Sequence, residues 1–216
     1  MSGAVQVDVW SDIACPWCYL GKRRLEAAIE AYDGPGPVTV TWHSFELDPG
    51  APHAVDGDMA SQLARKYGRT REQAAAMLEQ MTELASGEGL ELRFETSRGG
   101  NTFDAHRLVR LALAHGKQGE MKERLMRAYF TDGELVSDHA TLRRLALDVG
   151  LPAAEVDELL AGEEFAQDVR TDEHTAAQLG IDAVPFFVVA RRYAAKGAQP
   201  AEYLTQVLQQ AAADAR

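Results

Sequence analysis

Alternating hydrophobic and polar positions near the N-terminus predict a strand, a helix and a second strand. Residues 5–9 alternate valine with polar side chains, and residues 38–42 alternate valine with threonine before a tryptophan. Both patterns are typical of strands. Between them, the apolar residues of 16–32 fall on one helical face, and a Gly-Pro-Gly-Pro run at 34–37 ends that helix. This part of the chain therefore predicts a β-α-β unit.

The central part of the chain has the periodicity of helices. Residues 48–52 form a linker rich in Pro and Gly. From about residue 58 to residue 179, apolar residues recur with helical periodicity, and most breaks between the expected helices fall at glycines. The expected helices are 58–67, 70–86, 101–116, 118–130, 138–149, 152–161 and 163–179.

Strand character returns near the C-terminus. Residues 186–189 predict a strand and residues 193–195 its hairpin partner, although Arg191-Arg192 lacks the Gly or Asn favoured in tight hairpin turns. Pro200 then opens a last helix. The order β-α-β, helical insertion, β-β-α predicts an α/β fold. We expect a discontinuous domain of residues 1–48 plus 180–216 and an inserted all-helical domain of residues 49–179.

Composition and charge narrow the range of partners. Hydrophobic residues make up 46% of the chain and the net charge is −11, which argues against a nucleic acid or an anionic membrane as partner. The longest apolar run, near residues 184–190, is too short to span a bilayer. The first residues lack the basic segment of a secretory signal, so we expect a cytoplasmic protein.

The only two cysteines lie in Cys15-Pro16-Trp17-Cys18, where the first predicted strand meets its helix. Proline suits the first helical position, which places Cys15 at the N-cap. There, unpaired backbone N–H groups and the positive end of the helix dipole favour a thiolate, the nucleophile of thiol–disulfide exchange. We predict that Cys15 attacks and that Cys18, shielded one turn further on, resolves the mixed disulfide.

Two other interpretations of the pair are a buried structural pair and half of a zinc site. Structural zinc generally needs four Cys or His ligands. The chain has no second cysteine pair, and its six histidines show no metal-type spacing relative to the first pair. We therefore favour a redox pair and expect no metal site.

Three motifs follow one another along the chain, at residues 11–22 around the cysteines, 101–108, and 180–187 followed by Gly197-Ala198-Gln199. Together they resemble the DsbA-like thioredoxin-fold proteins, in particular the FrnE branch, over essentially the whole chain. The resemblance implies a thioredoxin fold with an inserted helical domain and thiol–disulfide oxidoreductase activity. Kappa-class glutathione transferases and 2-hydroxychromene-2-carboxylate isomerases share the superfamily but usually carry serine in place of Cys15, so the complete pair favours redox chemistry.

The resemblance also implies roles for residues distant from the cysteines. It implies a cis Val184–Pro185 bond facing the thiols, where Pro185 and the backbone of Val184 orient an extended substrate as in strand pairing. An ordinary proline opening a strand is the alternative. The family motif further assigns Asn101 and His106 to substrate binding. Asn101 is equally explained as a helix cap, and His106 as a hydrogen-bonded histidine at a domain interface.

Residues near the thiols have candidate roles of their own. Pro16 and Trp17 are expected to form substrate surface and to tune the redox potential of the pair. His43, Glu46 and Asp12 are candidate proton acceptors for Cys18, which must lose its proton before it attacks. Each of these three is also explained as a structural or solvated residue.

Three functional hypotheses follow. The first is a cytoplasmic dithiol–disulfide oxidoreductase acting on a disulfide- or thiol-bearing protein or small molecule. It requires no metal or organic cofactor, and glutathione or another thiol regenerates it. The second is a glutathione-dependent isomerase or transferase in which Cys18 is dispensable. The third is a chaperone or binding module with incidental cysteines. The sequence is compatible with a monomer and with a homodimer.

Overall fold

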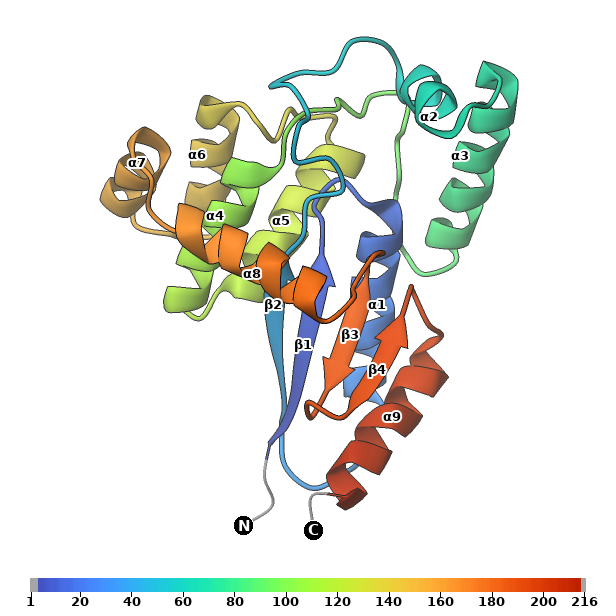
Figure 1. The fold of residues 1–216 in the computed structure, drawn as a ribbon, viewed down its shortest axis with the longest axis vertical. Coiled ribbons are helices and arrows are strands. Elements are labelled where there is room, and N and C mark those ends of the chain that lie inside the picture. Colours follow the sequence, from blue (N-terminus) through green and yellow to red (C-terminus); the bar gives the residue numbers. More distant parts are fainter. Residues whose placement is uncertain (1–3, 215–216) are drawn as a thin grey trace. The chain divides into compact units, whose positions relative to one another are not determined.

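The computed structural model describes residues 4–214, and its strands form one four-stranded sheet (Figure 1). β1 pairs in parallel with β2, whereas β3 pairs antiparallel with both β1 and β4. The sheet order is therefore β2-β1-β3-β4. The strands are β1 (Val5–Ser11), β2 (Val38–Ser44), β3 (Phe186–Val189) and β4 (Tyr193–Lys196).

The helices follow the predicted order closely. They are α1 (Pro16–Glu30), α2 (Met59–Tyr67), α3 (Arg71–Ser86), α4 (Phe103–Ala114), α5 (Gln118–Phe130), α6 (His139–Asp148), α7 (Ala153–Ala161), α8 (Ala166–Gln178) and α9 (Ala201–Asp214). None of the helices within residues 4–214 is long and apolar enough to cross a membrane. The predicted α/β class and the order β-α-β, helices, β-β-α are confirmed.

The described chain divides into two compact units. The first ends at Phe45 and resumes at Arg170, so it holds the sheet, α1, α9 and most of α8. The second, Glu46–Val169, is all-helical and holds α2 to α7. The domain limits expected from the sequence, 1–48 plus 180–216 and 49–179, stay predictions.

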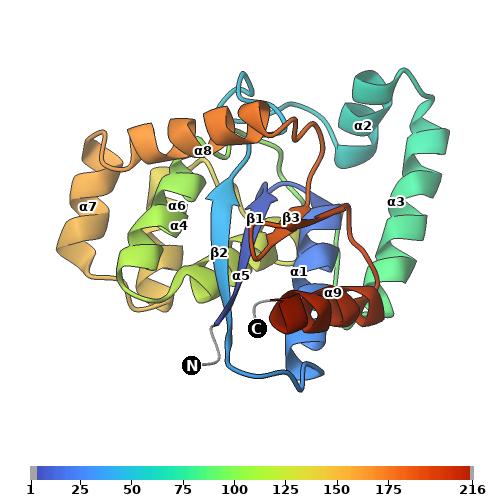
Figure 2. The ribbon, with the colours of Figure 1, turned by 60° about the horizontal axis from the view of Figure 1, so that its bottom comes forward.

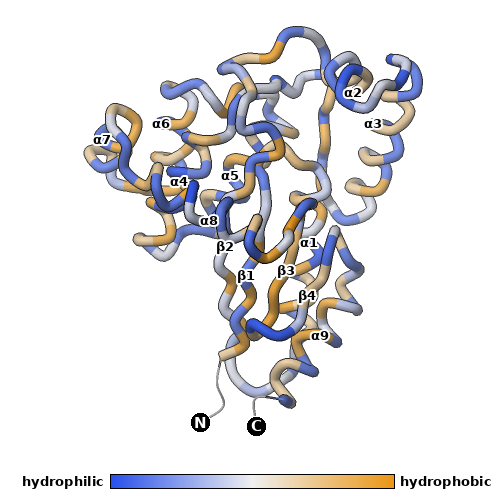
Figure 3. Tube along the Cα trace, viewed as in Figure 1, coloured by the Kyte–Doolittle hydropathy of each residue, from blue (hydrophilic) through white to orange (hydrophobic). Residues whose placement is uncertain are grey.

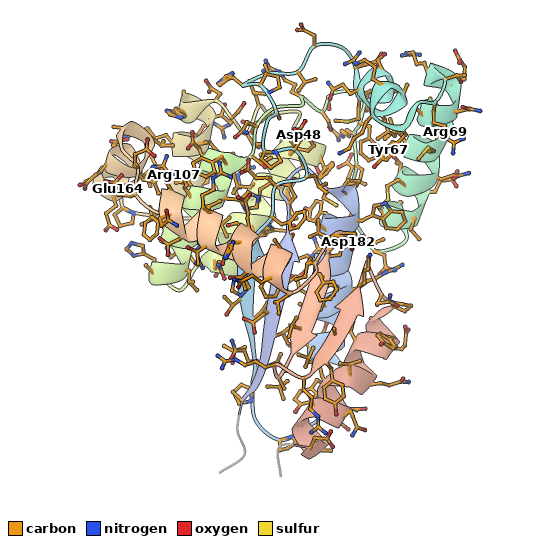
Figure 4. The ribbon with its side chains drawn as sticks, viewed as in Figure 1. Asp48, Tyr67, Arg69, Arg107, Glu164 and Asp182 are labelled. Atoms are coloured by element: carbon orange, nitrogen blue, oxygen red, sulfur yellow. The ribbon has the colours of Figure 1, made fainter. Side chains whose placement is uncertain are left out.

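The start of α8 differs from the sequence prediction. The helix begins at Ala166 rather than at residue 163, because Phe165 has a positive φ of 61°, outside the right-handed helical range. In the second unit, the buried guanidinium of Arg107 donates to the carbonyl of Glu164 at 2.8 Å and to that of Gly162 at 2.7 Å (Figure 4). These carbonyls are thus bound by a side chain before the helix starts.

The β3–β4 hairpin forms without the turn residues that such hairpins favour. Ala190 and Arg191 both have positive φ, 51° and 55°, and the Arg192 N–H donates to the Val189 carbonyl at 3.0 Å. This is the geometry of a type I′ turn. The predicted hairpin is confirmed, and the pairing of its strands imposes a turn that the local sequence does not favour.

β1 is buried on both faces rather than on one. Val7 and Val9 are buried on one face, and Asp8 and Trp10 are buried on the other. In the first unit α9 packs on α1 and contacts β1 and β3 (Figure 2), and hydrophobic residues run along β1 and β3 (Figure 3). The Trp10 face meets α8, where the Trp10 indole N–H donates to the Asp172 carbonyl at 3.1 Å. The polar Asp8 therefore lies inside the fold.

His43 joins this second face of the sheet to α8 through two carboxylates. Its Nδ1 lies 2.8 Å from Asp172 Oδ1 and its Nε2 lies 2.9 Å from Asp8 Oδ1, while its ring stacks on Trp10 with centroids 4.5 Å apart. Since ionised carboxylates only accept, both contacts are hydrogen bonds only when both ring nitrogens carry protons. Burial lowers the pKa of His43, but the hydrogen bonds to Asp172 and Asp8 outweigh it and raise that pKa above 6.5.

α1 and the loop before β3 approach each other at a glycine. The Val184–Pro185 bond is cis, as predicted. A Cβ at Gly21 would lie 2.7 Å from Pro185 Cγ and 3.3 Å from the Phe187 ring. The backbone carbonyl of Pro185 also accepts the Gly197 N–H at 2.8 Å. The packing of α1 on this loop therefore requires a residue without a side chain.

We expect His43→Gln to lower the free energy of unfolding by about 1.5–3 kcal/mol at about pH 6, because it removes charge-assisted hydrogen bonds. Since folding raises the pKa of His43, its stabilisation is complete below pH 6.5 and is lost as pH rises through the folded pKa. Denaturant unfolding of both proteins between about pH 6 and pH 9 checks this: the difference should narrow as pH rises.

The control is His115→Gln, which removes a more exposed pair with Glu155. It should change the free energy of unfolding by less than about 1 kcal/mol. A wild-type advantage over His43→Gln that grew with pH would contradict the charged state assigned to His43.

We expect Gly21→Ala to lower the free energy of unfolding by up to about 2 kcal/mol. Overpacking a rigid proline ring costs roughly 1–3 kcal/mol, which outweighs a gain of about 1 kcal/mol in helix propensity. Gly119→Ala is the matched control, because a Cβ there meets nothing within 4 Å in α5. It should be neutral or gain up to about 1 kcal/mol. Equal effects of the two substitutions in thermal or urea unfolding would refute the steric argument.

Candidate active site

Cys15 is the N-cap residue of α1, as the sequence predicts. The backbone of Cys15 is extended, and Pro16 is the first helical residue. The Cys15 carbonyl accepts the N–H groups of Cys18 at 3.0 Å and Tyr19 at 3.2 Å. The Cys15 side chain makes no capping hydrogen bond, and no acidic residue in the first turn opposes the positive end of the helix dipole. In general, the free backbone N–H groups at a helix N-terminus favour a thiolate at such a position.

The two thiols differ in their surroundings. Cys18 is fully buried, whereas Cys15 is 4% exposed and lies beside Trp17, which is 49% exposed. Pro16 is half-buried. Both thiols are therefore buried and differ only slightly in exposure, and the roles of attacking and resolving cysteine stay predictions.

The loop before β3 supplies a backbone group directly at the Cys15 sulfur. The Cys15 thiol donates to the Val184 carbonyl with 3.8 Å between Sγ and O, across 169 positions of sequence. Pro185 follows and packs on Gly21 of α1. Earlier in the same loop, Asp182 forms an ion pair at 2.5 Å with Lys196 of β4. An extended chain laid along Val184 would therefore bring a sulfur atom close to Cys15.

The candidate proton acceptors for Cys18 already have other partners. Asp12 is buried, and its Oδ1 accepts the Ile13 N–H at 2.6 Å. His43 is held between two aspartates, as described above. Glu46 is buried and belongs to the second unit. Proton transfer from Cys18 to any of the three stays a prediction. Across residues 4–214, no group of three or more His, Cys, Asp or Glu side chains is arranged to hold a metal ion.

Asn101 and His106 also belong to the second unit. The Asn101 Oδ1 accepts the Phe103 N–H at 2.8 Å at the start of α4, and its Nδ2 makes a long contact of 3.4 Å with Glu46 Oε1. The expected capping role of Asn101 is thus confirmed, although Thr102 is the formal N-cap residue. His106 is fully buried in α4. Substrate binding by Asn101 and His106 stays a prediction.

Three residues that shape this region are missing from the candidates chosen on sequence: Gly21, Asp8 and Asp172. Gly21 has a usable signal, since a glycine inside a predicted helix indicates close packing. Asp8 and Asp172 have none. A lone aspartate in an alternating strand or on a helix face is ordinarily solvated, and nothing local indicates that the two carboxylates share one histidine.

Comparison with known proteins agrees with the fold described above. A solved structure of a probable DsbA oxidoreductase from Streptomyces coelicolor is 44% identical, with a TM-score of 0.91 over 96% of this chain and 89% of that one. The uncharacterised protein YwbO of Bacillus subtilis (strain 168) is 29% identical over 190 residues, 86% of each chain. A 2-hydroxychromene-2-carboxylate isomerase shares the fold alone, at 13% identity and a TM-score of 0.69 over 98% of this chain and 99% of that one.

The family comparison covers nearly the whole chain. Residues 6–209, which include both cysteines and Pro185, match the model of the DSBA-like thioredoxin domain. The α/β thioredoxin-like fold predicted from the motifs is thereby confirmed. The chain belongs to the family of DSBA-like thioredoxin domains.

Proposed function

We propose that the protein is a dithiol–disulfide oxidoreductase in which Cys15 attacks and Cys18 resolves. The observation that carries the proposal is the 3.8 Å contact between Cys15 Sγ and the Val184 carbonyl at the N-terminus of α1. It joins a thiolate-stabilising position to a backbone edge that an extended substrate can pair with. Family membership and the identity to a probable DsbA oxidoreductase support the same class of reaction.

The proposed reaction is a pair of thiol–disulfide exchanges. The Cys15 thiolate attacks one sulfur of a substrate disulfide, whose S–S bond breaks as the other sulfur leaves as a thiolate. Cys18 then loses its proton and attacks Cys15 Sγ, which releases the second substrate sulfur. The protein's dithiol is oxidised to a disulfide by two electrons, and the substrate disulfide is reduced by two. The reverse sequence oxidises a substrate dithiol.

The chain's own residues would position this exchange. The Val184 backbone aligns an extended segment, Pro185 keeps that loop against α1, and Pro16 with the exposed Trp17 provides contact surface beside Cys15. Contact with Asn101 and His106 belongs to the same proposal and is supported only by the family motif. The substrate class is a disulfide- or thiol-bearing protein or small molecule.

The proposal also covers the branch of the family, the partners of the protein and the cellular compartment in which it acts. The three sequence motifs support membership of the FrnE branch. We propose that no metal or organic cofactor takes part and that glutathione or another thiol resets the pair, with no nucleic acid or membrane as partner. A chain with only this pair of cysteines suits a reducing compartment such as the cytoplasm. Activity as a monomer and activity as a homodimer both fit the proposal.

We expect a reversible two-electron transition when the protein is equilibrated against a series of reduced and oxidised glutathione. Acid trapping and mass spectrometry should show the loss of two hydrogens as the Cys15–Cys18 disulfide forms. Cys15→Ser is the control and should abolish the transition. If the wild type instead stops at a stable Cys15–glutathione adduct, the isomerase or transferase hypothesis replaces this one.

We expect Cys18→Ser to lower turnover of a disulfide substrate by more than about tenfold, because it removes the resolving sulfur. The variant should accumulate a mixed disulfide at Cys15, seen as a mass increase that dithiothreitol reverses. Unchanged turnover would indicate a glutathione-dependent isomerase. Unchanged function after replacement of both cysteines by serine would indicate a chaperone or binding module.

A further inference from the structure

The second unit contains an open groove beside helices α2 and α3. Its volume is about 690 Å³, within the range of small-molecule sites, roughly 300–1,000 Å³. All the residues that line it lie between Asp58 and Glu95, so the groove belongs to this one unit. It contains neither cysteine of the redox pair.

The inner surface of the groove is apolar. Leu92 and Phe94, from the segment after α3, line it and are buried, and Leu78 of α3 lines it half-buried. Met59 of α2 is likewise half-buried in the lining. A ligand with a hydrocarbon or aromatic body would remove the remaining apolar surface of these side chains from water, which is favourable.

The wall of the groove carries negative charges that lack cationic partners. Glu79 and Glu83 are exposed, and they lie one turn apart on α3, where two like charges destabilise a helix. In the chain from residue 4 to residue 214, neither of these two glutamates forms an ion pair. Glu95 is a further exposed carboxylate of the lining.

The one cationic side chain in the lining is already engaged. Arg71 donates to Asp58 Oδ2 at 2.7 Å, and this pair lowers the pKa of Asp58 to about 2. The nearby Arg69 lies at the turn between α2 and α3 and does not line the groove (Figure 4). The charge balance of the groove therefore leaves the carboxylates of α3 without a counter-charge.

We propose that this groove binds a small amphiphilic organic cation, namely an ammonium or guanidinium group on an apolar body. The cationic group pairs with Glu79 and Glu83, and the apolar body lies on Leu78, Leu92 and Phe94. A solvated acidic helix face explains the charges, and core packing explains Leu92 and Phe94, but neither explains why the half-buried Leu78 and Met59 line the same groove. The proposal stands whether or not Cys15 and Cys18 exchange disulfides.

The test uses the full chain and 4-phenylbutylamine as the probe, with binding followed by amide chemical shifts in nitrogen–proton NMR spectra. Shifts should concentrate in residues 58–95. The neutral isostere 4-phenylbutan-1-ol and the apolar-poor cation methylammonium should each bind at least about tenfold more weakly, because each lacks one of the two recognised groups. Equal binding of the amine and the alcohol would overturn the proposal.

The variant Glu79→Gln/Glu83→Gln keeps the shape of both side chains and removes both charges. It should weaken binding of the amine by about tenfold. The control, Glu30→Gln/Glu202→Gln, makes the same change in net charge at exposed positions of α1 and α9. It should leave the dissociation constant within about twofold. Equal weakening by both double variants, or shifts spread outside residues 58–95, would show non-specific attraction to an acidic protein and refute the site.

Discussion

The close packing of α1 against the loop before β3 is the constraint on which the candidate active site depends. Gly21 has no side chain, so the Pro185 ring can occupy the space where a Cβ would lie. That approach brings the Val184 carbonyl to the sulfur of Cys15, at the N-terminal end of the same helix. The N-terminus of a helix alone would favour a thiolate, but only this contact adds a backbone edge for a partner to pair with.

A second constraint acts on the opposite face of the sheet. His43 lies between Asp8 of β1 and Asp172 of α8, and Asp172 Oδ2 also accepts the Ser44 N–H at 2.8 Å. When its imidazole is protonated, His43 partly offsets two buried carboxylates, which would otherwise be costly inside the fold. α8 is followed directly by the loop that carries Pro185. By holding α8 against the sheet, the contacts of Asp172 with His43 and Ser44 therefore help to position this loop.

The order of the elements was accessible from the sequence because it depends on local periodicity and on breaks at Gly and Pro. The placement of Cys15 at the helix N-cap was accessible for the same reason, since Pro16 marks the first helical position. The features that the sequence did not predict are determined by contacts between distant segments. Phe165 interrupts the start of α8, and Ala190 turns a hairpin without a glycine, because packing overrides local preference at both places.

Gly21 could be recognised from local sequence, whereas the pairing of Asp8 and Asp172 with His43 could not. A glycine within a helix is visible in the sequence as a departure from helix propensity, although what packs on it is not. Asp8 and Asp172 look like ordinary polar positions, and only the pairing of β1 with β2 and the docking of α8 show that they share His43. Whether a charged side chain is buried depends on the assembled fold and cannot be predicted from the local pattern of hydrophobic and polar residues.

The sequence distance between Cys15 and Val184 has a consequence for the order of events during synthesis. The helical unit, Glu46–Val169, is contiguous in sequence, whereas β1 pairs with β3 and Cys15 contacts a residue 169 positions downstream. Because domains generally fold as units while the chain emerges, the helical unit can fold on the ribosome before the sheet is complete. The nascent dithiol therefore reaches its folded surroundings last, and until then both cysteines are open to whatever oxidants and thiols the compartment holds.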